Sequence, residues 1–276
     1  MKRSFRHGKS PCKTKGQLSP TLCLAFECKQ AFAESEYCPL REINLRIMRN
    51  EAFSHQRRIM KEQLEETRIV VAELFREMES SVTAYGPGAV KAQRLVDGTA
   101  FFPGGIGLWR GLEPHGEAPP NFPRCPIMIL GHNFDKVAGL EASWVRGVEL
   151  MGGATWLILR RYLETAKVDK LDCFFTNVFV GLQPVKSPGK VIANEEYYKQ
   201  CRDFLVRQIK RVKPRLVATL GIPAKEQYLL SGSQAPYISL VHPMYPFTLG
   251  RNGDKCAAIV ASEAAKLRNA LDALTA

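Results

Sequence analysis

Four short apolar runs, separated by longer segments, constrain the fold of this chain more than any other feature. The runs are Ile127–Leu130, Asp172–Thr176, Leu216–Leu220 and Tyr237–Val241. Apolar runs of this length are typical of parallel strands, which are buried on both faces of their sheet. The sequence therefore predicts a three-layer α/β/α domain with a central four-stranded parallel sheet.

Helical periodicity fills most of the segments between these runs. Residues 195–212 place Tyr198, Cys201 and Leu205 on one face, and this helix must stop before Pro214, which cannot continue it. Further helices are expected at about Thr155–Lys167, after Pro223 and over Ala257–Leu274. The residues from the first run to about Val145 are expected to form a loop.

The N-terminal part of the chain divides into three regions before the α/β domain. We expect a basic, poorly ordered leader over residues 1–45, an amphipathic helical extension over 46–85, a Gly/Pro-rich arm over 86–124, and the α/β domain over 125–276. The helical extension rests on apolar spacings of three, four and seven. Its stripe consists of Phe53, Met60, Leu64, Thr67, Val71, Leu74 and Met78.

The charge of the chain is basic and uneven. The formal net charge is +12, and residues 1–61 hold 13 Lys and Arg against 5 Asp and Glu, which accounts for +8 of it. A basic surplus attracts nucleic acid at long range, although a basic tail without a partner explains the same numbers. No apolar stretch is long enough to span a membrane. We expect a cytoplasmic, monomeric protein that does not enter membranes.

Polar side chains follow three of the apolar runs. The first run leads into Gly131-His132-Asn133-Phe134-Asp135, and the second ends at Asn177. The fourth leads into Val241-His242-Pro243-Met244-Tyr245. The C-terminal ends of parallel strands meet at one edge of a sheet, where open α/β folds bind ligands. Amide and imidazole groups there are suited to read or polarise a small ring.

In their order and spacing these segments resemble the uracil-DNA glycosylase superfamily, nearest to its small bacterial and archaeal branches. The resemblance covers roughly Cys125 to Leu274 and is densest over Asp172–Gly221. It implies a monofunctional DNA glycosylase, acting in base excision repair, that hydrolyses the N-glycosidic bond of uracil or a related deaminated base. Such enzymes bind DNA and flip the target base out of the duplex.

The resemblance also implies roles for individual residues. Asn177 would read the O4 and N3–H edge of uracil with its amide, which carries a donor and an acceptor. His242 would hydrogen-bond the uracil O2 as negative charge develops on the leaving base. Tyr245, Phe247 and Arg251 are the expected DNA contacts. Tyr245 and Phe247 can form an apolar wedge in the gap left by the flipped base, or pack against their own domain.

The first segment departs most from the family pattern, which is Gly-Glu-x-Pro-Gly in the iron-sulfur branch and Gly-x-Asn-Pro-Gly in others. Asn133 falls at the position of a water-positioning Asn, and Asp135 is an additional carboxylate that can orient water or stabilise the sugar cation. Both stay open as the residue that holds the water. Trp144 is the expected ring that stacks on the base, with Phe134 as the fallback.

We expect no cofactor and no metal. The iron-sulfur branch takes two ligands from an N-terminal Cys-x-x-Cys, one from just after the Thr-Asn segment and one from before the long helix. Cys201 matches the last position, but Gly181 occupies the third, and Cys23 and Cys28 are separated by four residues. The irregular spacing of the N-terminal cysteines also lacks a paired zinc knuckle.

Two other functions fit parts of the sequence. The altered first segment fits a non-catalytic nucleic-acid-binding member of the same fold, and the α/β pattern alone fits a nucleotide-processing hydrolase. The glycosylase hypothesis requires Asn133 or Asp135, Asn177 and His242 to line one pocket. The hydrolase hypothesis requires a metal or nucleophile site, and the sequence offers no such pattern.

Overall fold

A computed structural model describes most of the second half of the chain and parts of the first half. The described residues are 54–55, 68–86, 90–96, 101–109, 126–133, 137–147, 149, 152–182, 194–250 and 253–274. The chain separates into two units, Met1–Gln56 and Arg57–Ala276. All the elements below belong to the second unit. No helix in the described part of the chain is long and apolar enough to cross a membrane.

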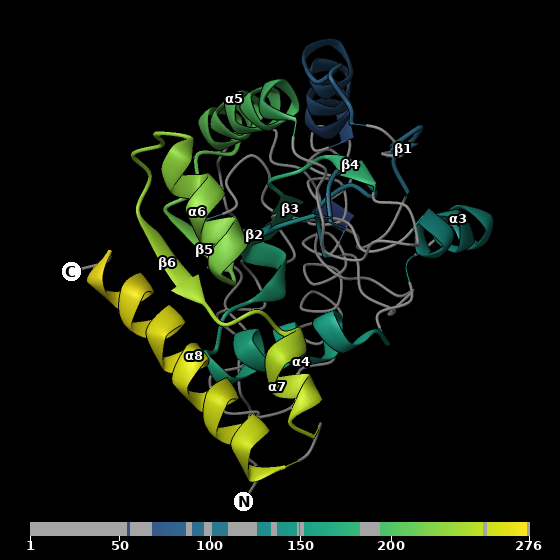
Figure 1. The fold of residues 1–276 in the computed structure, drawn as a ribbon. Helices are drawn as coiled ribbons and strands as arrows, with labels where there is room; N and C mark the ends of the chain where they lie inside the picture. Colours follow the sequence, from purple (N-terminus) through teal and green to yellow (C-terminus); the bar gives the residue numbers. More distant parts are fainter. Residues whose placement is uncertain are drawn as a thin grey trace, which may run out of the picture. The chain divides into compact units, whose positions relative to one another are not determined.

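A four-stranded parallel sheet forms the centre of the second unit (Figure 1). Its strands are β2 (Ile127–Gly131), β3 (Cys173–Asn177), β5 (Leu216–Leu220) and β6 (Tyr237–Leu240), in the order β3-β2-β5-β6. Every residue of β2, β3 and β5 is buried. The four predicted strands are therefore confirmed. The mostly apolar composition of β2, β3 and β5 is typical of strands covered on both faces.

Helices alternate with these strands along the chain. They are α3 (Val137–Arg146), α4 (Ala154–Thr165), α5 (Glu195–Val212), α6 (Ile222–Leu230), α7 (Met244–Thr248) and α8 (Asp254–Ala273), with a 3-10 turn η1 at Lys170–Asp172. Two short strands, β1 (Val90–Lys91) and β4 (Gly181–Leu182), form a separate antiparallel pair. The helix α3 lies where we predicted a loop, and that prediction was wrong. Gly139 and the lack of an acidic first turn weaken the helical signal in this segment.

Each face of the central sheet has its own apolar cluster. Ile129 and Phe175 point to a cluster that includes residues of α4 and α8. Leu130 and Phe174, one position along each strand, point to a cluster that includes residues of α5, α6 and the helical residues 68–81. This alternation confirms the three-layer α/β/α arrangement and places a helical extension beside it.

The described part of the helical extension follows the predicted stripe. Val71, Leu74 and Met78 are buried in the cluster on the α5 side of the sheet. The upstream stripe positions Phe53, Met60, Leu64 and Thr67 lie outside the described residues.

The helix α5 begins and ends as its sequence predicts. The Asn194 side chain accepts a hydrogen bond from the Tyr197 N–H at 3.1 Å, which caps the first turn. At the other end, Lys213 has a φ of 51°, and Pro214 follows it. The chain thus leaves the helix through one left-handed residue before the strand β5 begins.

Part of the Gly/Pro-rich arm lies along the outer strand β3. The Phe102 N–H donates to the Phe175 carbonyl at 3.0 Å, and the Phe175 N–H donates to the Gly107 carbonyl at 2.7 Å. A Cβ atom at Gly107, where φ is 73°, would lie 2.5 Å from Phe174 Cε2. Trp109 is buried in the cluster on the α4 side. Residues 101–109 therefore cover the free edge of β3 and are built into the core.

Candidate active site

The C-terminal ends of β2 and β3 bring Gly131 and Asn177 next to each other. They are register partners in the parallel pair. A Cβ atom at Gly131 would overlap the Asn177 Oδ1 atom. The Asn177 amide therefore lies over the position where residue 131 has no side chain. A side chain at residue 131 would displace this amide.

The Asn177 side chain is well placed to meet a ligand. The residue is 4% exposed. Among the described residues, none forms a hydrogen bond with its amide. The amide nitrogen and oxygen also do not belong to the fully buried side-chain atoms that have no hydrogen-bond partner. Polar groups that are nearly buried in native proteins usually have partners. A bound molecule is therefore a candidate partner for the donor and the acceptor of this amide.

An aromatic ring that we did not predict lies at the same place. A Cβ atom at Gly131 would be 3.4 Å from Phe101 Cε1. The Phe101 ring is held at centroid distances of 5.1 Å from Trp156 and 5.8 Å from Phe175. Trp156 in turn donates through Nε1 to Glu149 Oε1 at 2.6 Å. In the sequence the signal for Phe101 is weak, since the ring belongs to the arm that precedes the first strand.

His242 follows the edge strand β6 and is held in one tautomer. The Met244 N–H donates to His242 Nδ1 at 3.2 Å, so Nδ1 carries a lone pair. Burial lowers the pKa of His242 below its usual 6.5. A neutral imidazole that accepts at Nδ1 carries its hydrogen on Nε2. The ring can thus donate one hydrogen bond from Nε2 without bearing a positive charge.

Gly221 allows His242 to approach the end of β5. A Cβ atom at Gly221, where φ is 84°, would lie 3.1 Å from His242 Cβ. The Gly221 N–H also donates to the Leu240 carbonyl at 2.8 Å, at the end of β6. A side chain at residue 221 would push the histidine away from the sheet edge and would strain the backbone.

The first segment places a second histidine near His242. His132 Nδ1 lies 3.2 Å from Asn133 Oδ1, and the His132 ring meets Phe179 edge-on at a centroid distance of 5.1 Å. Burial lowers the pKa of His132, and the nearby His242 lowers it further. Because an amide oxygen only accepts, Nδ1 is the donor in this contact. His132 thus links Asn133 to the sheet edge that carries Asn177 and His242.

The remaining predicted site residues are placed as follows. Phe134, Asp135 and Arg251 lie outside the described residues. Trp144 is on α3, where Arg94 donates to its carbonyl at 3.0 Å and lies 5.7 Å from the centre of its ring. None of the described contacts of Trp144 is with Asn177 or His242. A stacking role for Trp144 therefore stays a prediction.

The helix α7 presents two different aromatic side chains. Tyr245 is 56% exposed. Phe247 is partly buried against the cluster on the α4 side of the sheet. Of the two predicted wedge residues, Tyr245 is therefore available to DNA, whereas Phe247 contributes to the packing of α7.

The two described residues at the iron-sulfur positions, Gly181 and Cys201, do not fit a cluster, whereas Cys23 and Cys28 lie outside the described residues. A Cβ atom at Gly181 would lie 2.6 Å from the Tyr197 hydroxyl and 3.1 Å from Tyr85 Cδ1. Cys201 is fully buried, and burial raises the pKa of its thiol to about 11, which disfavours the thiolate that binds metal. Tyrosine rings occupy the space beside this helix. Among the described residues, no three His, Cys, Asp or Glu side chains are grouped to hold a metal.

Comparison with known families agrees with this architecture. The model of the uracil DNA glycosylase superfamily matches residues 87–260, which is more than half of the chain. The match begins upstream of Cys125, where the resemblance in the sequence starts, and it includes the arm that carries Phe101. A search of curated proteins found no match. With the parallel sheet, the polar strand ends and this match, the chain belongs to the uracil-DNA glycosylase superfamily.

Proposed function

We propose that this protein hydrolyses the N-glycosidic bond of uracil, or of a related deaminated base, in DNA. The superfamily generally hydrolyses N-glycosyl bonds and acts on DNA. The observation that carries the proposal for this chain is the Asn177 amide. It lies against Gly131 at the end of β3, and no described residue forms a hydrogen bond with it.

Base recognition would rest on Asn177 and Phe101. One amide offers a donor to the uracil O4 and an acceptor to N3–H, whereas cytosine presents the reverse pattern. The Phe101 ring, beside the same space, offers an apolar face on which a flipped base can stack. Gly131 leaves room for the Asn177 amide, and the Phe101 ring also lies next to this position.

His242 would stabilise the leaving group. When the C1′–N1 bond breaks, its electron pair stays on the base, and negative charge grows at O2. The Nε2–H of His242 can donate to that oxygen, since Nδ1 already accepts from Met244 N–H. Hydrogen-bond donors fixed before the reaction stabilise developing charge without a reorganisation cost. The neutral ring acts here as a donor and keeps its proton.

A water molecule would complete the reaction by bonding to C1′. Asn133 can orient this water but cannot accept its proton, because an amide is not basic. Asp135 carries the carboxylate that can accept it. The His132 contact at 3.2 Å would hold the Asn133 side chain in place. We propose Asn133 and Asp135 in these complementary roles and Tyr245 as the exposed DNA contact.

The first test is the variant Asn177→Ala. Removing a two-point hydrogen bond that strengthens in the transition state should lower the single-turnover excision rate by about 100-fold or more. The rate is measured as base release from oligonucleotides that contain uracil, hypoxanthine or xanthine. Gln234→Ala is the matched control, because it removes an exposed amide whose contact among the described residues is with the Gly232 carbonyl.

Two outcomes would change the assignment. A folded Asn177→Ala protein with unchanged excision would remove Asn177 from the site. A wild-type protein that binds DNA but releases none of these bases would favour the non-catalytic alternative, which the altered Gly131–Asp135 segment fits.

A further inference from the structure

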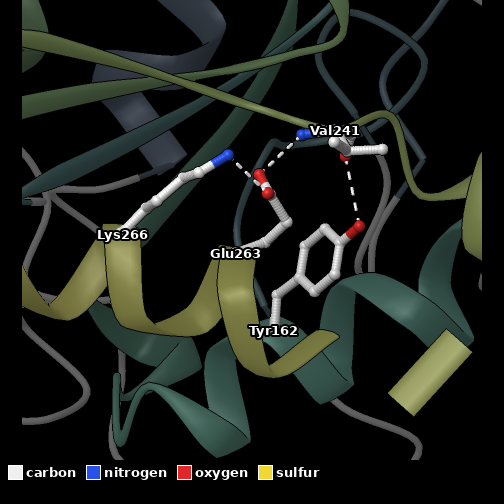
Figure 2. A network of polar contacts seen from close by, with 4 residues as sticks. All are labelled: Tyr162, Val241, Glu263 and Lys266. Carbon is white, nitrogen blue, oxygen red and sulfur yellow. Dashed lines mark hydrogen bonds and ion pairs between the residues drawn. The ribbon is translucent and has the colours of Figure 1, made fainter. Parts of the chain in front are cut away.

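The backbone of Val241 is held by two helices immediately before His242. The Val241 N–H donates to Glu263 Oε2 at 2.8 Å, and the Tyr162 hydroxyl donates to the Val241 carbonyl at 3.2 Å (Figure 2). Glu263 belongs to α8 and Tyr162 to α4. Val241 lies just beyond the last residue of β6. Both polar groups of its backbone are thus satisfied by side chains after the strand has ended.

The carboxylate in this contact is buried. Glu263 is 2% exposed, and Lys266 Nζ lies 2.6 Å from Glu263 Oε1. A buried carboxylate is costly unless it is paired and hydrogen-bonded. Here one carboxylate oxygen pairs with the Lys266 ammonium group, and the other accepts the hydrogen bond from the Val241 N–H. A hydrogen bond to an ionised acceptor is stronger than one to a neutral acceptor. The Glu263 carboxylate therefore fixes the position of the Val241 peptide group.

The next residue along the chain is the proposed donor to the leaving base. Its carbonyl accepts from the Tyr245 N–H at 2.9 Å, and its Nδ1 accepts from the Met244 N–H at 3.2 Å. These two contacts come from α7, whose residues Met244 and Tyr245 are exposed. The contacts at Val241 come from α4 and α8, which cover one face of the sheet. His242 therefore lies between an exposed short helix and a buried anchor.

We propose that Glu263 is a positioning residue for His242. Through the Val241 backbone it holds the imidazole in the Nε2–H tautomer and at the sheet edge when DNA contacts α7, and Tyr162 supports the same peptide. The role in excision rests on the proposed function. The effect on the His242 ring does not, since the Val241 contacts hold the backbone that leads into the Met244 N–H contact with Nδ1.

The experiment uses the full chain and the variants Glu263→Ala, Glu263→Gln and Tyr162→Phe. Ring ¹⁵N chemical shifts report the His242 tautomer, with His242→Gln to assign the resonances among the 5 histidines. We expect one Nε2–H tautomer in the wild type and a mixture of both tautomers in Glu263→Ala. Single-turnover excision should fall about 10-fold to about 100-fold, because small displacements of a reacting group are costly. Affinity for DNA should stay within about twofold.

The other variants separate positioning from general stability. Glu263→Gln keeps an acceptor for the Val241 N–H and should recover most of the tautomer and the rate. Tyr162→Phe removes only the hydroxyl and should give a smaller shift. Asp272→Ala is the control on the same helix, since it breaks an exposed ion pair with Arg268 at 3.1 Å and should change neither readout.

The proposal is overturned if Glu263→Ala folds with the wild-type tautomer, even where its melting temperature falls. If that variant does not fold, an unchanged tautomer and an unchanged rate in Tyr162→Phe overturn it. A wild type without excision whose tautomer responds to Glu263→Ala or Tyr162→Phe refutes the proposed function alone.

Discussion

Gly131 and Asn177 form the smallest unit of the candidate site. They are paired in the register of β2 and β3, and the missing Cβ at residue 131 leaves room for the amide. The same reasoning applies to Gly221, whose missing Cβ lets His242 approach the end of β5. At two strand ends, the absence of a side chain therefore decides where a side chain of the proposed site lies.

Gly131→Ala should displace the Asn177 amide. Its Cβ would overlap Asn177 Oδ1 and lie 3.4 Å from Phe101 Cε1, so neighbouring side chains must shift. We expect a loss of about 1–3 kcal/mol in the free energy of unfolding and a fall in excision of about 10-fold or more. Denaturant unfolding and single-turnover excision measure these effects. Gly139→Ala is the control, because its Cβ meets nothing within 4 Å, and excision should be unchanged. Equal rates in both variants would contradict the prediction.

The pH dependence of excision should follow His242. Burial lowers the pKa of His242, so the donor ring stays neutral at and somewhat below its usual 6.5. Excision should hold as the pH falls to 6.5 and decline only at lower pH, as the ring protonates. An NMR titration of the ring should give a midpoint below 6.5. A midpoint above 6.5 would contradict the burial of the ring.

The same shift has a consequence for stability with a defined sign. A histidine whose folded pKa is lowered favours the unfolded state when it protonates, so its contribution is complete above pH 6.5 and is lost as the pH falls. Glu149 acts in the opposite direction, because burial raises its pKa to about 7. The difference in free energy of unfolding between wild type and His242→Gln isolates the histidine effect. That difference should favour the wild type less at about pH 5 than at about pH 8.

At the scale of elements, the termini of α5 are set by local chemistry. Asn194 caps the first turn, and Lys213 takes a left-handed conformation at the last one, with a φ of 51°. A side chain in this conformation costs free energy that glycine does not. The position of this helix matters to the site, because Gln208 on α5 accepts from the Thr176 hydroxyl at 2.8 Å, one residue before Asn177.

Lys213→Gly should therefore stabilise the protein. We expect the free energy of unfolding to rise by about 0.5–1 kcal/mol, since glycine adopts the left-handed conformation without strain. The matched variant Lys210→Gly lies inside α5 and should lower it by about 1 kcal/mol. Thermal and denaturant unfolding of both variants measure the changes. Destabilisation by both would indicate that the left-handed conformation at residue 213 carries no strain.

At the scale of the whole molecule, the charge distribution bears on DNA affinity. Residues 1–45 hold 8 Lys and Arg against 4 Asp and Glu and lie outside both the family match and the described residues. Basic residues that contact phosphate raise affinity without reading the base, and they release counterions when they bind.

Deleting residues 1–45 should weaken DNA binding and leave the chemical step unchanged. The slope of log affinity against log salt should become shallower by about 0.9 for each phosphate that the shortened protein no longer neutralises. Binding at several salt concentrations and single-turnover excision at saturating protein measure the two effects. A second version with the leader kept and its Lys and Arg changed to Gln separates charge from length. Loss of the cooperative thermal transition on deletion would show that the leader belongs to the core.

The sheet, the family and the order of the polar strand ends could be predicted from the sequence. Strands buried on both faces are mostly apolar, so β2, β3 and β5 are visible as nearly continuous apolar runs. Asn177 and His242 stand directly after such runs, which puts them at one sheet edge before any contact is known. The helix α3 was not predicted because the helical signal in its sequence is weak.

The residues that complete this sheet edge could not be predicted from the sequence. Phe101 lies beside Asn177, Gly221 makes room for His242, and Glu263 holds the Val241 peptide. Each of these contacts joins segments that are far apart along the chain, and periodicity and propensity describe only neighbours in sequence. The tyrosine rings beside Cys201 are a further case, because a sequence shows that a ligand position is absent but does not show which side chains take up the space.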